Sequence, residues 1–281
     1  MRIEKADKIG FCFGVKRAIN ILERVVRERG EIETLGATVH NQQVLQRLAG
    51  LGVRVVNSVN DIQGDTVVIS SHGVAPSLET EIRDRHISII DTTCPFVHRA
   101  QLVAQKLAQA GFFVVVYGDA NHPEVKGILG WAGDKVLATL EDKFVIGFDQ
   151  LPRRLGVLSQ TTQIPDHFTK FMRKLIDSIF VRDSELRIID TICHDVRERQ
   201  AAALKLTKKV DLMLVIGGRA SANTNHLVQL CSTITKTYLI ETVGEIQPSW
   251  LQGHHYIGVA AGASTSEQTI NEVLVKLADM A

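Results

Sequence analysis

The chain has 281 residues, of which 45% are hydrophobic and 22% are charged, proportions typical of a globular protein. Its 32 basic and 31 acidic residues nearly balance, so the charge gives no sign of nucleic-acid binding. No apolar run approaches the roughly 18 residues of a membrane-spanning helix, and the first residues lack the apolar stretch of a signal peptide. These features predict a cytoplasmic protein without a membrane or nucleic-acid partner.

In chain order, the hydrophobic pattern alternates between helices and strands. The first third predicts a helix over 15–29, a strand ending at 36, a helix over 43–49, and strands over 53–56 and 66–70. The second third predicts a helix over 96–110, a strand over 112–117 that Pro123 ends, and two or three strands leading to 156–159. The last third predicts a helix over 196–208, a strand over 211–216, a helix holding Cys231, and a strand over 256–260. This alternation predicts an α/β fold with mainly parallel sheets, in which ligands bind beyond the carboxyl ends of the strands.

Three cysteines, Cys12, Cys94 and Cys193, each stand between a strand-like and a helix-like run. The chain then repeats itself, with valine three positions after each cysteine and glycine twenty-four positions after it. The second and third copies also share the lead-in Ile-Ile-Asp-Thr. The pattern indicates an internal threefold repeat. It predicts three similar subdomains over 13–94, 95–193 and 194–281, with the N-terminal segment 1–12 packing near the third.

A pseudo-threefold arrangement of these subdomains would bring the three cysteines together as a three-thiolate metal site. Thiolates bind zinc, copper(I) or iron-sulfur clusters, and a 4Fe-4S cluster with three cysteine ligands keeps one iron open. A disulfide framework is not expected in a reducing compartment. Cys231 breaks the repeat and lies in an apolar helical setting, which predicts a core residue.

The same symmetry gathers polar residues from the ends of the predicted strands. One set of loops supplies His40, His122 and Ser221; the other supplies His72, Thr161 or Thr162, and Ser264. Together with Asn41 and Asn223, these histidines, hydroxyls and amides suit a phosphate or diphosphate. Glu124 follows Cys94 by thirty residues, as Asn223 follows Cys193. The negative charges of a nearby diphosphate and thiolates would favour the protonated form of this carboxyl, and a protonated carboxyl suits a general acid.

Nine motifs carry a resemblance to a known family. They are Gly10-Phe-Cys-Phe-Gly-Val-Lys-Arg-Ala18, Val39-His-Asn41, Ser71-His-Gly73, Thr93-Cys-Pro95, His122-Pro-Glu-Val125, Gln160-Thr-Thr162, Thr191-Ile-Cys193, Ser221-Ala-Asn-Thr-Asn225 and Ala261-Gly-Ala-Ser264. In this order, and almost from end to end, the chain resembles the 4-hydroxy-3-methylbut-2-enyl diphosphate reductase family. The resemblance implies a trefoil of three α/β subdomains around a central 4Fe-4S cluster. It also implies a reductive dehydration that gives isopentenyl and dimethylallyl diphosphates, the last step of the non-mevalonate isoprenoid pathway.

The resemblance also implies a role for each matched residue. Cys12, Cys94 and Cys193 are the implied cluster ligands, and the residues implied to hold the diphosphate are His40, His72, His122, Ser221, Asn223 and Ser264. Glu124 is implied in proton delivery, and Thr161 near the substrate hydroxyl. The implied partners are the allylic diphosphate and a one-electron donor such as ferredoxin or flavodoxin. Ala222 stands where some family members have a second serine, which removes one hydroxyl donor.

Two other functions fit the same residues. A non-redox hydro-lyase would also use an open iron of a 4Fe-4S cluster, but it would turn over without a reductant. A phosphate-binding protein would use the three cysteines for a structural zinc site. Metal analysis of anaerobically purified protein separates zinc from iron and sulfide, and turnover without reductant identifies the hydro-lyase.

Overall fold

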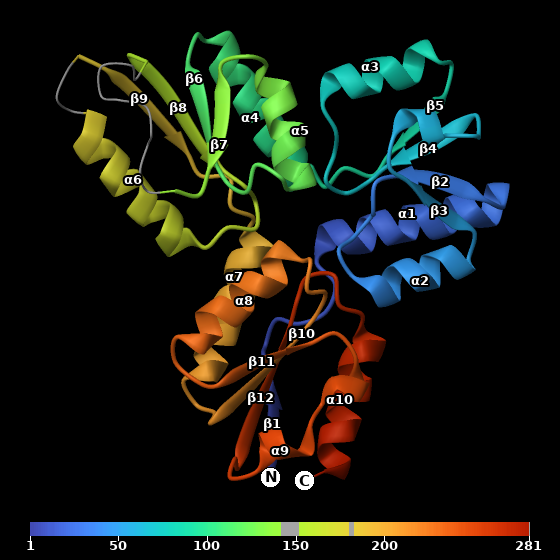
Figure 1. Cartoon of the computed structure of the whole chain (residues 1–281), viewed down its shortest axis with the longest axis vertical. Coiled ribbons are helices and arrows are strands. Elements are labelled where there is room, and N and C mark those ends of the chain that lie inside the picture. Colours follow the sequence, from blue (N-terminus) through green and yellow to red (C-terminus); the bar gives the residue numbers. More distant parts are fainter. Residues whose placement is uncertain (142–151, 180–182, 281) are drawn as a thin grey trace. The chain divides into compact units, whose positions relative to one another are not determined.

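The computed structural model describes residues 1–141, 152–179 and 183–280 (Figure 1). The described residues form three four-stranded sheets with helices between the strands, which confirms the expected α/β class. The chain divides into two compact units. Unit 1 contains Met1–Glu31, Ala37–Arg54 and His194–Ala281, and unit 2 contains Ile32–Gly36 and Val55–Cys193.

The sheet of unit 1 joins the start of the chain to its last third. Its strand order is β1 (Arg2–Lys5), β12 (Tyr256–Ala261), β10 (Leu212–Ile216) and β11 (Thr237–Ile240), and all its pairings are parallel. Every residue of β10 is fully buried, because a central parallel strand is covered on both faces. The continuous apolar run therefore has the structure that its composition predicts.

The helices of unit 1 bury the apolar faces that their spacing predicts. They are α1 (Phe13–Arg29), α2 (Gln42–Gly50), α7 (His194–Thr207), α8 (Ala222–Ser232), α9 (Pro248–Leu251) and α10 (Glu267–Asp279). In α1, for example, Ala18 and Leu22 are completely buried. Cys231, on α8, is also completely buried in an apolar cluster, and its Sγ accepts a hydrogen bond from the Thr207 hydroxyl at 3.2 Å. Its assignment to the core is confirmed.

Unit 2 contains most of the other two sheets. One has the order β3 (Val53–Val56), β2 (Ile32–Leu35), β4 (Thr66–Ile69) and β5 (Ser88–Asp91), with β3 crossing the boundary between the units. The other has the order β7 (Val136–Thr139), β6 (Phe113–Tyr117), β8 (Arg154–Ser159) and β9 (Glu185–Ile189). The helices of unit 2 are α3 (Pro76–Asp84), α4 (Pro95–Gln109), α5 (Pro123–Ala132) and α6 (Pro165–Ile179).

One strand order recurs in all three sheets. The first strand after each cysteine (β2, β6 or β10) lies between the next two strands of its repeat, and the strand that precedes a cysteine (β5, β9 or β1) occupies the edge. In the third sheet this edge strand is β1, which leads to Cys12. The three sheets are therefore copies of one topology, with the copy that leads into Cys12 split between the two ends of the chain.

The sequence predicted only strands between Pro123 and residues 156–159, and it missed a helix over residues 123–132. These residues form α5, followed by the single strand β7, while residues 142–151 lie outside the described part. Pro123 starts the helix rather than only ending a strand, because the first helical turn has no internal partner for a backbone N–H. Glu124 is therefore in the first turn of a helix and not in a loop.

Close packing holds the two sheets of unit 2 together. The indole Nε1 of Trp131, on α5, donates to the carbonyl oxygen of Val74 at 2.9 Å. A Cβ on Gly130 would lie 2.2 Å from the Cβ of Ala75, so only glycine permits this approach. The contact fixes α5 beside the loop that follows β4, and this loop carries His72.

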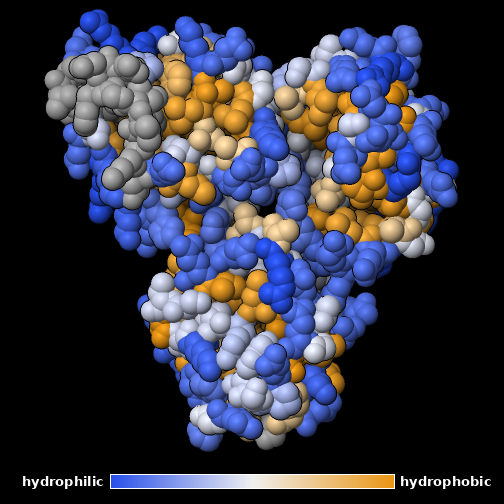
Figure 2. Space-filling model, viewed as in Figure 1, coloured by the Kyte–Doolittle hydropathy of each residue, from blue (hydrophilic) through white to orange (hydrophobic). Residues whose placement is uncertain are grey.

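Hydrophilic residues cover much of the face drawn in Figure 2, and hydrophobic residues appear there as separate patches. Within the described ranges, no helix combines the length and apolar character needed to cross a bilayer.

Candidate active site

Each repeat cysteine lies at the N-terminal end of a helix. Cys12 and Cys94 are the N-cap residues of α1 and α4, and Cys193 directly precedes α7. The first backbone N–H groups and the helix dipole favour a negative charge at this position, such as the thiolate that binds a metal. The Val15 N–H points at the Sγ of Cys12 at 3.4 Å. Burial nevertheless raises the pKa of the Cys12 thiol, so without a metal it stays protonated at neutral pH.

One backbone hydrogen bond recurs at all three cysteines. The N–H of Cys12 donates to the carbonyl of Ala263 at 3.0 Å, that of Cys94 to Ser71 at 3.0 Å, and that of Cys193 to Thr161 at 2.9 Å. The residues that follow these three acceptors are Ser264, His72 and Thr162. Thr162 is thus the repeat equivalent of His72 and Ser264. The sequence alone left this assignment open between Thr161 and Thr162. Each cysteine is therefore fixed to a loop that presents a predicted site residue.

In unit 1, the buried side chains of Asn223, in the first turn of α8, and Ser264, in the loop after β12, have no partner among the described residues. Asn223 and Ser264 are 4% and 6% exposed. Neither the amide atoms of Asn223 nor the hydroxyl of Ser264 has a hydrogen-bond partner among the described residues. Ser221 N-caps α8, and its Oγ accepts the Thr224 N–H at 3.3 Å. Buried polar atoms are normally paired, so these unpaired donors and acceptors are suited to a polar ligand.

His40 belongs to the same group of loops in unit 1. Its carbonyl oxygen lies against Gly218, which follows β10, so closely that a Cβ on Gly218 would be 2.1 Å away. Asn41, the next residue, N-caps α2 through its Oδ1, which accepts the Val44 N–H at 3.2 Å. Burial lowers the pKa of the His40 imidazole, so the ring is neutral at neutral pH.

Gly218→Ala is expected to move the His40 backbone away from the loop after β10. The added methyl group would overlap a backbone oxygen, which cannot turn aside as a side chain can. We expect the substitution to destabilise the protein by about 1–3 kcal/mol, measurable by denaturant unfolding. Gly50→Ala, at the end of α2, is the control, since nothing lies within 4 Å of its Cβ position and its backbone is not in the left-handed region. Equal stability of wild type and Gly218→Ala would contradict the close contact.

In unit 2, Glu124 and Thr161 form a buried pair. Glu124 is 2% exposed, its Oε1 accepts the Thr161 N–H at 2.7 Å, and its Oε2 accepts the Thr161 hydroxyl at 2.9 Å. Burial raises the pKa of the Glu124 carboxyl to about 7, although both hydrogen bonds from Thr161 act in the opposite direction. The carboxyl therefore has a substantial protonated fraction at neutral pH, as a general acid requires.

His72 and His122, the two histidines of unit 2 that are predicted to bind the diphosphate, lie side by side next to this pair. His122 N-caps α5, and its Nδ1 accepts the Glu124 N–H at 3.2 Å. The rings of His72 and His122 meet edge to face with their centroids 5.5 Å apart. The Nδ1 of His72 is 3.5 Å from the Ser70 hydroxyl. The backbone bond at Nδ1 of His122 makes that nitrogen the acceptor and leaves Nε2 to carry the proton.

The structure therefore brings the predicted site residues together within each unit. Unit 1 holds Cys12, His40, Ser221, Asn223 and Ser264; unit 2 holds His72, Cys94, His122, Glu124, Thr161 and Cys193. The hydrogen bonds described above join neighbouring loops inside each group.

One residue near Cys12 escapes the sequence patterns. Arg199, on α7, is 1% exposed and donates to the carbonyl of Ala261 at 3.1 Å and to the Asp195 carboxylate at 3.2 Å. Its positive charge lowers the pKa of the Cys12 thiol, whereas Asp195 raises it, and both effects are smaller than that of burial. Because an arginine in a helix is usually exposed, only the structure reveals this position.

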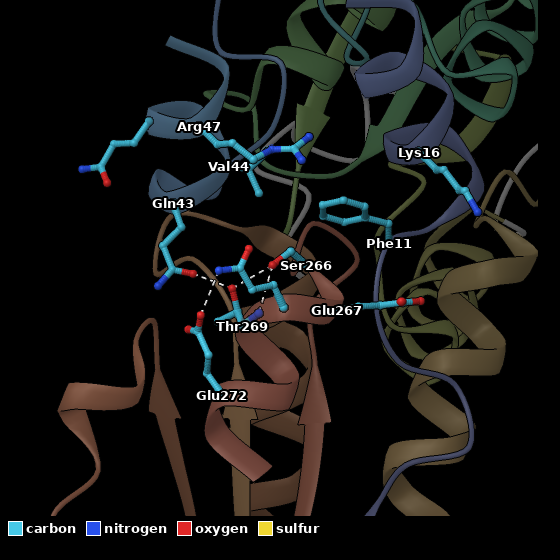
Figure 3. Close-up of a pocket in the computed structure, with 11 residues that line it drawn as sticks. Phe11, Lys16, Gln43, Val44, Arg47, Ser266, Glu267, Thr269 and Glu272 are labelled. Carbon is cyan, nitrogen blue, oxygen red and sulfur yellow. Dashed lines mark hydrogen bonds between the residues drawn. The ribbon is translucent and has the colours of Figure 1, made fainter. Parts of the chain in front are cut away.

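Unit 1 also contains a cavity of about 800 Å³ (Figure 3). Phe11, Lys16, Gln43, Arg47 and the start of α10 line it. None of the predicted diphosphate residues, all of which the structure describes, is part of its lining. The cavity is therefore distinct from the predicted diphosphate residues.

The chain is similar to known proteins over nearly its full length. The profile of the LytB protein family matches residues 3–278. A protein of Dehalococcoides mccartyi (strain CBDB1), named 4-hydroxy-3-methylbut-2-enyl diphosphate reductase, is 60% identical over 273 residues, covering 97% of this chain and 96% of that protein. A protein of the same name from Geobacter sulfurreducens is 40% identical over 279 residues, covering 99% of this chain and 97% of that protein.

Two solved structures are also similar. The structure of (E)-4-hydroxy-3-methyl-but-2-enyl diphosphate reductase, described as the terminal enzyme of the non-mevalonate pathway, has a TM-score of 0.71 at 37% identity, covering 99% of this chain and 100% of that one. The Plasmodium falciparum structure of E-1-hydroxy-2-methyl-but-2-enyl-4-diphosphate reductase has a TM-score of 0.90 at 26% identity, covering 98% of this chain and 87% of that one. The similarity thus extends over both units.

Proposed function

Because the chain belongs to the LytB family, we propose that it reduces 4-hydroxy-3-methylbut-2-enyl diphosphate to isopentenyl and dimethylallyl diphosphates, the last step of the non-mevalonate pathway. The reaction consumes two electrons and two protons, breaks the bond between carbon and the hydroxyl oxygen, and releases water. The observation that carries the proposal is the backbone hydrogen bond that ties each of the three cysteines, all at helix starts, to a polar loop. A cytoplasmic location and a ferredoxin or flavodoxin as donor stay predictions.

The residues present suit an iron-sulfur cofactor. Cys12, Cys94 and Cys193 would hold a 4Fe-4S cluster and leave one iron without a protein ligand, and helix N-termini favour the thiolates this requires. When bound, such a cluster supplies electrons one at a time and a Lewis-acidic iron. The common strand order of the sheets supports three subdomains, 13–94, 95–193 and 194–281, in a pseudo-threefold trefoil around the cluster.

The polar loops would bind the diphosphate through neutral donors. Asn223 and Ser264 are buried with no partner in the described part of the chain, so the Asn223 amide N–H and the Ser264 hydroxyl could each donate to a phosphate oxygen. Ser221 and the three histidines His40, His72 and His122 complete the set. A diphosphate held in this way fixes the position of the reacting carbon.

His40→Ala and Asn223→Ala are each expected to raise the Michaelis constant for the substrate by about 10- to 100-fold. This range corresponds to losing a hydrogen bond to a charged group, worth about 1.5–3 kcal/mol. Steady-state kinetics with a saturating reductant would measure it. Asn225→Ala is the matched control, because Asn225 is exposed and its side chain donates to the Arg219 carbonyl. An unchanged Michaelis constant in both variants would argue against this diphosphate site.

Glu124 and Thr161 would deliver a proton to the hydroxyl that leaves as water. The protonated carboxyl of Glu124 is the donor, and its contact with the Thr161 hydroxyl fixes its orientation. Thr161 would lie near the substrate hydroxyl. Asp and Glu are rarely this buried without an ion pair, so the burial of Glu124 has a functional explanation here.

Anaerobic turnover tests the proposal directly. Purified protein is given the allylic diphosphate and reduced methyl viologen, and the products are identified by mass spectrometry. Formation of isopentenyl and dimethylallyl diphosphates only with reductant is the expected result. Turnover without reductant would indicate a hydro-lyase, and zinc without activity would indicate a binding protein; either result would overturn the proposal.

A further inference from the structure

The exposed face of α1 carries a row of basic residues that starts beside Cys12. Phe13, the residue after Cys12, is 59% exposed. The other exposed residues of this face, in helical spacing, are Lys16, Asn20, Arg24, Arg27 and Glu28. We call these six residues the α1 face. Lys16, Arg24 and Arg27 make no ion pair with any residue that the structure describes, so their charges are available to a partner.

Among the described residues, the corresponding helices of the other two repeats have fewer exposed cations without an ion pair, and neither begins with an aromatic residue as exposed as Phe13. On α4, which follows Cys94, the exposed cations are Arg99 and Lys106, and the first aromatic residue, Phe96, is partly buried. On α7, which follows Cys193, the exposed Glu198 pairs with Lys8 at 2.9 Å. Since the whole chain has a net charge of only +1, the α1 face is a local concentration of positive charge.

A recess adjoins the N-terminal end of the α1 face. Lys16 belongs to both the face and the lining of the 800 Å³ cavity of unit 1. Figure 3 shows the Phe11 ring and the Arg47 guanidinium pointing into this cavity. Phe11 and Phe13 thus flank Cys12 in sequence, one lining a recess and the other exposed. Aromatic and arginine side chains are enriched in protein interfaces, so this surface has the composition of a docking site.

We propose that the α1 face is the docking surface for a small acidic one-electron carrier protein. The inference rests on the proposed function, which requires electrons from outside the chain. A basic surface attracts an acidic carrier and speeds its association. Electron-transfer complexes are typically small and transient, so one helix face with an aromatic residue provides enough contact. Cys12 lies at the start of this helix, so a carrier bound there comes close to the cluster ligand.

The test separates docking from catalysis by using two reductants. The probes are an acidic 2Fe-2S ferredoxin, which must dock, and reduced methyl viologen, which needs no docking surface. The variants are Phe13→Ala and the double variant Arg24→Glu/Arg27→Glu, all at exposed positions outside the proposed active site. The matched control is Arg99→Glu/Lys106→Glu on α4, which reverses two exposed charges after a different cysteine.

Both α1 variants should weaken ferredoxin binding and lower ferredoxin-driven kcat/KM by about tenfold or more at low ionic strength. Binding is measured calorimetrically, independently of turnover. Methyl viologen-driven turnover and the α4 control should stay near wild type, and added salt should reduce the difference for Arg24→Glu/Arg27→Glu. Unchanged ferredoxin binding in the α1 variants, an equal loss in the α4 control, or no binding by the wild type overturns the docking surface. Failure of the proposed function appears separately, as absence of viologen-driven turnover in the wild type.

Discussion

Replacing Cys12, Cys94 or Cys193 by serine is expected to remove iron from the protein and abolish turnover. A serine hydroxyl remains protonated at neutral pH and is a hard, weak ligand for iron in a cluster, whereas a thiolate is a soft, strong one. All three cysteines have the same place at a helix start and the same backbone hydrogen bond, so loss of any one should have a similar effect. Iron and sulfide analysis of anaerobically purified variants measures the result.

Cys231→Ser is the matched control for these variants. Cys231 is completely buried on α8 and contacts the Thr207 hydroxyl, and its burial raises its pKa, so it remains a neutral thiol. Serine can keep the contact with Thr207, and iron content should stay near wild type. Circular dichroism would show that all four variants fold. Full iron and activity in the Cys12, Cys94 or Cys193 variant would refute a cluster on these three residues.

The sequence predicted most elements because their apolar residues follow a clear period. The helix expected over 15–29 is α1 (Phe13–Arg29), and the strand expected over 211–216 is β10 (Leu212–Ile216). The failure at α5 has a local cause. Pro123 can end a strand or begin a helix, and the polar residues 121–124 do not decide between them. The helical signal lies beyond them, where Val125, Ile128 and Ala132 are spaced three and four apart.

The residues of the candidate site could be predicted from the sequence, but the contacts between them could not. Equivalent spacing after each cysteine identified Glu124, but the bonds from Thr161 join residues 37 apart in sequence. The sequence also could not choose between Thr161 and Thr162, because the repeat is marked there by a backbone hydrogen bond rather than by a side chain. Arg199 was not predicted because its burial depends on a contact with Ala261 at the end of β12, far away in the sequence. No local sequence pattern indicates such a contact.

Glu124→Gln is expected to lower turnover by roughly 10² to 10⁴ fold while iron content and substrate binding stay near wild type. Glutamine keeps the size of the side chain, and its carbonyl oxygen can still accept a hydrogen bond from Thr161, but it has no acidic proton. Single-turnover kinetics with reduced protein would measure the chemical step. Glu81→Gln, at an exposed position of α3, is the matched control.

The pH dependence distinguishes an acid from a base at this position. The pKa of Glu124 is raised to about 7, so the proton-donating form predominates below about pH 7. Turnover by the wild type should therefore fall as the pH rises through 7, and this dependence should disappear in Glu124→Gln. A Glu124→Gln rate within a fewfold of wild type, under saturating reductant, would mean that the proton comes from Thr161 or, through a water, from the diphosphate.

The same titration should appear in the stability of the folded protein. A carboxyl with a raised pKa binds its proton more tightly when folded, so its contribution to stability is present below the unfolded value of 4.5 and is lost as the pH rises through about 7. Between these values the wild type should lose about 3 kcal/mol of unfolding free energy relative to Glu124→Gln. Denaturant unfolding of both proteins across this pH range measures the difference between their unfolding free energies. The titration of all other groups is common to both proteins and cancels in this difference. A difference that does not vary with pH would mean that Glu124 is already ionised in the folded protein, and it could then not be the proton donor.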